Sequence, residues 1–161
     1  MTGDLVLRDV VEEDLPIFFE YQLDPEANQM AAFTAKDPND QEAFTAHWGR
    51  ILTAPTVIIR TIAVEGQVVG SVLSYEEEGR PEVSYWIGRA YWGRGIATRA
   101  LTSFLAEVNT ERPINARVAK DNVGSIRVLE KCGFGVTGET TGFANARGEE
   151  IEELVMELTA G

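Results

Sequence analysis

At Gly95 the hydrophobic periodicity of the chain changes from that of strands to that of a helix, and this change constrains the fold most. Before it, Val57–Val64 and Val68–Tyr75 are β-branched runs separated by a glycine-containing turn, which is typical of a β-hairpin. After it, apolar residues recur every three or four positions up to Val108. The chain is therefore predicted to combine a sheet with helices that cover it.

The rest of the chain supplies further elements of both kinds. Asp24 to Asp40 contains Asp-Pro and Lys-Asp-Pro-Asn-Asp runs, which indicate a loop. We find no repeat or linker and predict one mixed α/β domain over residues 1–161. The predicted strands are Leu5–Leu7, Glu82–Ile87, Ile114–Ala119, Phe134–Phe143 and Glu152–Leu158, and the predicted helices are Glu12–Leu23, Gln41–Leu52 and Asn122–Lys131.

Composition and charge exclude several classes of protein. The 161 residues include 14 Lys or Arg and 26 Asp or Glu, which gives a net charge of −12. Such a chain repels a nucleic-acid backbone, so no nucleic-acid partner is expected, and cationic partners such as amines are favoured. No apolar stretch reaches the roughly 20 residues that span a bilayer, and no secretory signal is recognisable. The single Cys132 fits a reducing compartment. We expect a cytoplasmic protein without a membrane anchor.

Two reactive residue types are too scarce for common catalytic sites. One histidine and one cysteine cannot form a Cys/His zinc cluster, so no metal is expected. His47 lies in a predicted helix with Phe44 and Trp48 on its apolar stripe, which favours a surface or packing role over a place in a catalytic triad. Cys132, next to Gly133, is expected to pack in the core.

A glycine-rich turn, Tyr91–Thr98, joins a predicted strand to the long helix. Glycines let backbone N–H groups crowd inward, and the first-turn amides of a helix are unpaired and carry its positive dipole end. This arrangement suits a phosphate or pyrophosphate. A Walker loop is excluded because Arg94 and Gly95 stand where lysine and a hydroxyl are required, and a Rossmann fingerprint lacks its downstream acid.

A second motif lies one predicted strand further on, with Asn122, Ser125 and a Gly-Phe pair at 133–134. With the turn at 92–97, it resembles the signature of the GNAT superfamily of N-acetyltransferases. A tryptophan replaces the usual Gln or Arg of the turn, and with Ser125 this is similar to the branch that includes ribosomal-protein N-terminal acetyltransferases. The resemblance covers the whole chain. It implies a mostly antiparallel sheet with one splayed parallel pair, flanked by helices.

The resemblance implies acetyl-CoA as co-substrate, with no metal. Its pantetheine arm would pair with the backbone of strand Glu82–Ile87, and its diphosphate would lie on the amides of the glycine turn. The residues expected to bind it are Trp86, Ile87, Gly93, Arg94, Gly95, Ile96, Ala97, Thr98, Asn122 and Ser125.

The expected reaction is direct attack of a primary amine on the thioester in a ternary complex. Many family members have a tyrosine seven residues after the motif asparagine as acid for the leaving thiol, but here that residue is Leu129. Ser125 is our candidate acid by resemblance, with Tyr85 as a more distant substitute. Glu82 is our candidate base; a water chain stays open, and a solvated glutamate is the commoner outcome at such a strand end.

The acceptor is less defined by sequence. In the superfamily the N-terminal helices and their connecting loop, here Asp24–Asp40, usually build the acceptor wall. Met30, Phe33 and Trp48 are candidates to line it, with packing as their default role. The acceptor is expected to be a peptide or protein N-terminus or a small amine, and the final hairpin offers a surface for a homodimer. A catalytically silent acyl-CoA-binding module and a nucleotide-dependent phosphotransferase are the alternative functions.

Overall fold

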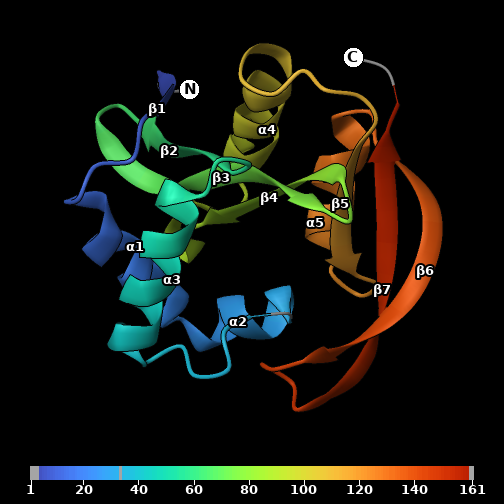
Figure 1. Ribbon diagram of the computed structural model, residues 1–161, viewed down its shortest axis with the longest axis horizontal. Helices are drawn as coiled ribbons and strands as arrows, with labels where there is room; N and C mark the ends of the chain where they lie inside the picture. Colours follow the sequence, from blue (N-terminus) through green and yellow to red (C-terminus); the bar gives the residue numbers. More distant parts are fainter. Residues whose placement is uncertain (1–3, 33, 160–161) are drawn as a thin grey trace.

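A single sheet organises the computed structural model, which describes residues 4–32 and 34–159 (Figure 1). Every neighbouring pair of its strands is antiparallel except β4 and β5, which are parallel. The predicted mixed sheet with one parallel pair is confirmed. In spatial order the strands of the described residues are β1 (Leu5–Arg8), β2 (Ile58–Val64), β3 (Gln67–Glu77), β4 (Arg80–Ile87), β5 (Ile114–Ala119), β7 (Glu149–Leu158) and β6 (Gly135–Ala144).

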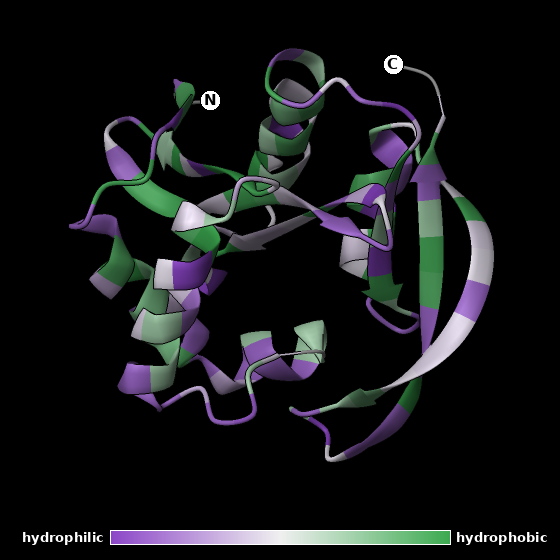
Figure 2. Ribbon diagram, viewed as in Figure 1, coloured by the Kyte–Doolittle hydropathy of each residue, from purple (hydrophilic) through white to green (hydrophobic). Residues whose placement is uncertain are grey.

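Helices pack on both faces of this sheet. The main core joins α4 and α5 to the central strands and is centred on Phe104 and Leu101. A second core joins α1 and α3 to the other face through Phe18 and Trp48. Figure 2 shows hydrophobic and hydrophilic residues alternating along these helices, as expected when one side of a helix covers a sheet. The helices are α1 (Asp14–Gln22), α2 (Pro25–Ala31), α3 (Gln41–Thr53), α4 (Ile96–Glu107) and α5 (Val123–Lys131), with a 3-10 turn η1 (Arg89–Tyr91).

Helix α2 contradicts the prediction of a loop over Asp24–Asp40. The Asp24 carboxylate accepts the backbone N–H groups of Glu26 and Ala27 at 3.0 and 3.4 Å, and Pro25 is the first helical residue. An Asp-Pro pair is therefore an N-cap followed by a favoured first position here, not a chain break. The prediction was wrong because proline was taken only as a signal that ends structure.

Strand β4 is paired very differently on its two edges. Its register with β3 is continuous from Gly70 opposite Ile87 to Glu77 opposite Arg80. Its register with β5 consists of one pair, Glu82 opposite Asn115. Because the two strands separate beyond that pair, the edge of β4 toward β5 is free of a ladder along most of its length. The expected splay of the parallel strands is confirmed.

Candidate active site

The glycine loop connects the open end of β4 to helix α4. Gly93 and Gly95 have φ values of 78° and 73°, which glycine adopts without strain, and Gly95 is the N-cap of α4. A Cβ built on either glycine meets no described atom within 4 Å, so the space beside the loop is open. Within the described chain, no side chain caps α4. The first-turn amides of Ile96, Ala97 and Thr98 are thus left for an outside acceptor.

Aromatic side chains fix the shape of this loop. The Trp92 indole N–H donates to the Ile87 carbonyl at 2.8 Å, while the residue stays 41% exposed. The Arg94 guanidinium lies 5.7 Å from the centre of the Tyr91 ring, within range of a cation–π contact. Ile87 itself is buried in the main core. Trp86 is partly buried, and its indole nitrogen has no hydrogen-bond partner among the described residues.

The asparagine motif forms the start of helix α5, across the opening from β4. Asn122 is the N-cap, and its Oδ1 accepts the Ser125 N–H at 3.2 Å. Ser125 Oγ lies 2.8 Å from the Tyr85 hydroxyl oxygen. Burial raises the pKa of Tyr85, and the hydrogen bond to Ser125 offsets only part of that shift. Leu129, one turn after Ser125, is buried in the main core. Sequence spacing gave no sign that Tyr85 and Ser125 touch.

Glu82 lies at the one residue pair where β4 and β5 meet. It is 4% exposed, so the expectation of a solvated glutamate is wrong. Arg117 Nε donates to its Oε1 at 2.8 Å, and Tyr75 lies opposite Glu82 in the register of β3 and β4. Burial, together with the nearby Glu82 charge, raises the pKa of Tyr75. The pKa of Glu153 is also raised, chiefly by burial. The charge of Arg117 opposes this shift, and the charge of Glu82 adds to it. These four side chains therefore share one partly desolvated cluster.

The acid and base candidates lie on opposite faces of β4. Successive side chains of a strand alternate between faces. Val83, Tyr85 and Ile87 pack with the main core beneath α4 and α5. Glu82 and Trp86 consequently point to the face covered by α1, α2 and α3. The structure thus brings Ser125 together with Tyr85 on one face of β4 and places Glu82 on the other face.

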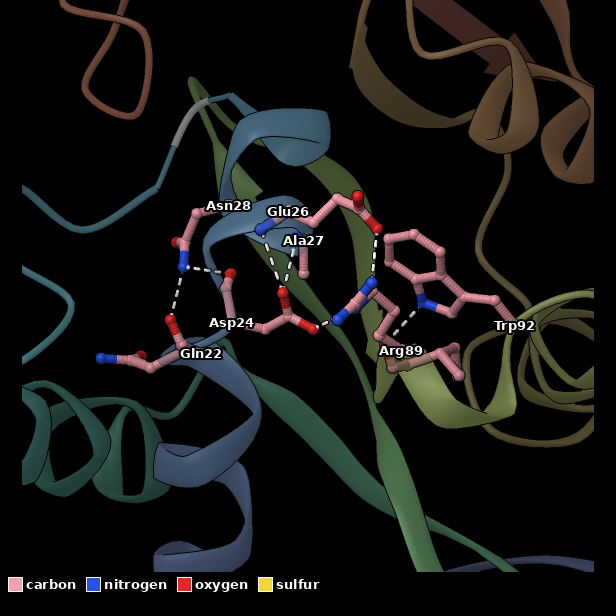
Figure 3. Close-up of polar contacts among 8 residues, drawn as sticks. Gln22, Asp24, Glu26, Ala27, Asn28, Arg89 and Trp92 are labelled. Carbon is pink, nitrogen blue, oxygen red and sulfur yellow. Dashed lines mark hydrogen bonds and ion pairs between the residues drawn. The ribbon is translucent and has the colours of Figure 1, made fainter.

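Helix α2 is fastened to the glycine loop at its N-terminal end, as Figure 3 shows. Arg89, which begins η1, donates to Asp24 at 2.5 Å and to Glu26 at 2.6 Å. The Asn28 side-chain amide donates to the carbonyl oxygens of Gln22 and Asp24, which closes the turn between α1 and α2 (Figure 3). Helix α2, part of the segment expected to build the acceptor wall, is therefore positioned by the same segment that forms the glycine loop.

The other end of α2 is held by the turn between β6 and β7. Ala146 N–H donates to the Ala32 carbonyl at 3.2 Å, and Arg147 Nε donates to the Gln29 carbonyl at 3.0 Å. Arg147 also forms two hydrogen bonds with Asp121, the residue before the α5 cap. Among the residues predicted to line the acceptor wall, Met30 of α2 is exposed, Trp48 is buried in the second core, and Phe33 lies outside the described residues.

Of the remaining reactive residues, His47 lies outside this site, whereas Cys132 lies beside it: its thiol donates to the Thr98 carbonyl at 3.8 Å. His47 is exposed on α3, and Cys132 is half-buried against the main core, where burial raises the pKa of its thiol. In the described ranges, no group of three or more His, Cys, Asp or Glu residues is placed to hold a metal ion. None of the described helices is both long and apolar enough to cross a membrane.

Comparison with known proteins agrees with this geometry. A sequence model of the acetyltransferase (GNAT) domain matches residues 4–135. An uncharacterised N-acetyltransferase of Bacillus licheniformis, p20, is 27% identical over 98% of this chain and 93% of its own length. The chain belongs to the GNAT family and is an acetyl-CoA-dependent acetyltransferase.

Solved structures share the fold at low sequence identity. RimJ of Mycobacterium smegmatis, in complex with a CoA disulfide, superposes with a TM-score of 0.80 at 23% identity, over 98% of this chain and 83% of that one. Spermidine N-acetyltransferase of Vibrio cholerae, in complex with CoA and spermine, gives 0.82 at 16% identity, over 96% and 95%. RimL, a ribosomal L7/L12 α-N-protein acetyltransferase in complex with CoA, gives 0.76 at 20% identity, over 100% and 97%.

Proposed function

We propose that this enzyme transfers the acetyl group of acetyl-CoA to a primary amine at the opening between β4 and β5. One observation carries the proposal: the free edge of β4 leads from the single pair at Glu82 and Asn115 to the open glycine loop. A free strand edge offers backbone groups to a linear amide-containing arm, and a helix N-terminus offers an anion site. The two lie end to end, as a pantetheine arm that ends in a diphosphate requires.

The residues of the loop fit the diphosphate. The open space at Gly93 and Gly95 is the volume that a Cβ would begin to fill. We assign the diphosphate to the amides from Gly93 to Thr98 and the thioester end to the region near Asn122 and Ser125. Since Ile87 is buried and Trp86 faces the α1–α3 side, their side chains flank the arm at most, and β4 contributes chiefly backbone groups.

Acetyl-CoA supplies an activated acyl carbonyl with a thiolate as leaving group. In the transfer, the amine nitrogen bonds to the acyl carbon, the carbon–sulfur bond breaks, the nitrogen loses a proton and the sulfur gains one. An alkylamine has a pKa of about 10, so the acceptor arrives mostly as an ammonium ion and must lose one further proton before its nitrogen can attack. We assign removal of its proton to Glu82 and hydrogen bonding of the departing sulfur to Ser125.

The two faces of β4 support this division of roles. The amine approaches from the side of α1–α3, where Glu82 is buried, and the sulfur leaves toward the side of α5, where Ser125 is held. A β4 backbone N–H polarises the carbonyl as negative charge develops on its oxygen. Arg117 holds the Glu82 carboxylate in place through its hydrogen bond.

The acceptor is proposed to be a cationic primary amine. The chain has a net charge of −12, and two buried or half-buried carboxylates, Glu82 and Glu153, share this cluster with one arginine. By their names, the related folds act on a protein N-terminus in RimL and on spermidine in the Vibrio cholerae enzyme. Both acceptors carry primary amines, so they define the panel to be tested.

The test is release of CoA thiol from acetyl-CoA in the presence of a panel of amines: spermidine, lysine-like alkylamines and peptides with free N-termini. We expect metal-independent thermal stabilisation by acetyl-CoA and turnover with at least one member of the panel. No interaction with CoA at millimolar concentration would overturn the cofactor assignment. Binding without turnover for any amine would identify a silent acyl-CoA-binding module, and stabilisation only by ATP with magnesium would identify a phosphotransferase.

A further inference from the structure

We infer that Tyr85 is a positioning residue for the transfer: its hydroxyl donates a hydrogen bond to Ser125 Oγ and thereby directs the Ser125 hydroxyl proton at the departing sulfur. The inference rests on the proposed function. It starts from the 2.8 Å separation of the two hydroxyl oxygens, which belong to residues 40 positions apart in the sequence.

The two hydroxyls come from opposite sides of the opening. Tyr85 belongs to β4, three residues beyond the Glu82 pair, on the part of the strand that has left β5. Ser125 lies in the first turn of α5, which directly follows β5. A ligand arm that runs along the free edge of β4 toward Glu82 therefore passes beside this pair of hydroxyls. No other side chain is recorded in hydrogen-bond contact with Ser125 Oγ among the residues that the structure describes.

Either hydroxyl of this pair can be the donor, and we assign that role to Tyr85. A serine hydroxyl has one proton and two acceptor lone pairs. If Tyr85 donates to Ser125 Oγ, the Ser125 proton is left to point elsewhere, and its backbone is held by the Asn122 cap at 3.2 Å. Burial raises the pKa of Tyr85, so the phenol keeps its proton across the neutral range and stays a donor.

Among the described neighbours of Ser125, Tyr85 is placed to donate a hydrogen bond to its hydroxyl oxygen, and Leu129 is not. Residues four apart on a helix lie on one face, so Leu129 follows Ser125 on the side that faces the sheet. Leu129 is a buried hydrocarbon and has no proton to share. The ring of Tyr85 packs against the main core, which fixes the position of its hydroxyl. In the transfer, Ser125 donates a hydrogen bond to the sulfur as negative charge develops there. The Tyr85 hydroxyl then stabilises the increased negative charge on the Ser125 oxygen by donating a hydrogen bond to it.

The test is a double-mutant cycle with Tyr85→Phe, Ser125→Ala and the double variant, measured with acetyl-CoA and the best amine of the panel. Tyr85→Phe keeps the ring and removes only the hydroxyl. We expect it to lower kcat roughly 3- to 10-fold, as the loss of one hydrogen bond does, with the KM for acetyl-CoA and the melting temperature unchanged. Ser125→Ala is expected to lower kcat about 100-fold. Ser125→Thr, which keeps a hydroxyl, should retain most of the activity.

The decisive result is the double variant. If Tyr85 acts through Ser125, Tyr85→Phe has no further effect in the Ser125→Ala background. Tyr21→Phe is the matched control, because its hydroxyl donates to the Val68 carbonyl outside this pair, and its kcat should stay within about twofold of the parent. Effects that multiply, or a Tyr85→Phe variant as fast as the parent, would overturn the inference while leaving the acetyltransferase intact. A parent enzyme that binds CoA but transfers to no amine would overturn both.

Discussion

The two edges of strand β4 differ in how far their backbone groups are paired with a neighbouring strand. Toward β3 the strand is in continuous register from Arg80 to Ile87, and the backbone groups on that edge serve the sheet. Toward β5 it keeps one pair, at Glu82, and the rest of that edge leads to the glycine loop. One strand can therefore be part of the sheet along one edge and bind a ligand along the other. Backbone N–H and C=O groups that have no partner in the sheet need a hydrogen-bond partner elsewhere. Substitutions on the two edges should therefore have separable effects.

The largest effect is expected at the glycine loop. Gly95→Glu places a carboxylate in the open space beside the first turn of α4, where it fills the hollow and repels a diphosphate. We expect CoA binding, measured by calorimetry, to fall at least about 100-fold.

Gly66→Glu is the matched control for this substitution. Gly66 lies in the turn between β2 and β3, with φ 80° and open space around it, so the new side chain brings the same charge and a similar backbone strain away from the loop. Its CoA affinity should equal that of the parent. Equal losses in the two variants would show that strain, not the diphosphate site, explains the result.

Glu82→Gln tests the point where β4 still pairs with β5, at the end of the free edge. Glutamine keeps the shape of the side chain but cannot take a proton from an ammonium group. We expect kcat to fall about 100-fold or more, with CoA affinity retained. Steady-state kinetics with acetyl-CoA and the best amine of the panel, together with calorimetry of CoA binding, separate the two effects.

Glu77→Gln serves as the control, since Glu77 is exposed at the far end of β3. A Glu82→Gln variant that keeps the kcat of the parent would assign proton removal to water or to another carboxylate.

Gly70→Ala tests the laddered edge. A Cβ at Gly70 would lie 2.0 Å from the Trp86 carbonyl oxygen, so β3 and β4 must shift apart. We expect a loss of about 2–3 kcal/mol in the free energy of unfolding, seen as a lower denaturant midpoint. Gly138→Ala in β6, where a Cβ meets no described atom within 4 Å, should cost well under that. A Gly70 variant as stable as Gly138→Ala would contradict the tight approach of the two strands.

The smallest effect is expected at the contact between α2 and the loop. Arg89→Ala removes the hydrogen bonds to Asp24 and Glu26 that hold α2 beside η1. Since Arg89 is half exposed, solvent screens these pairs, and we expect only a 2- to 5-fold rise in the KM for the amine. Arg80→Ala, at the exposed start of β4, should leave that KM unchanged. Equal KM values for the two variants would show that α2 is held without Arg89.

Much of the fold was readable from short stretches of sequence. The period change at Gly95, the hairpin over Val57–Tyr75 and the strand Ile114–Ala119 were predicted with boundaries close to those observed. Helix α2 was missed because a seven-residue helix is shorter than the window in which periodicity shows, and its Asp-Pro start also fits a loop.

The sequence by itself determined the elements, the glycine loop and the asparagine motif, because helical period, strand alternation and glycine conformations are set by neighbours a few residues apart. Only the tertiary structure decided that Glu82 is buried against Arg117, 35 positions away, and that Tyr85 meets Ser125. Those contacts depend on the order of strands and on where β4 and β5 part. That geometry is fixed by packing across the whole sheet, which no local pattern encodes.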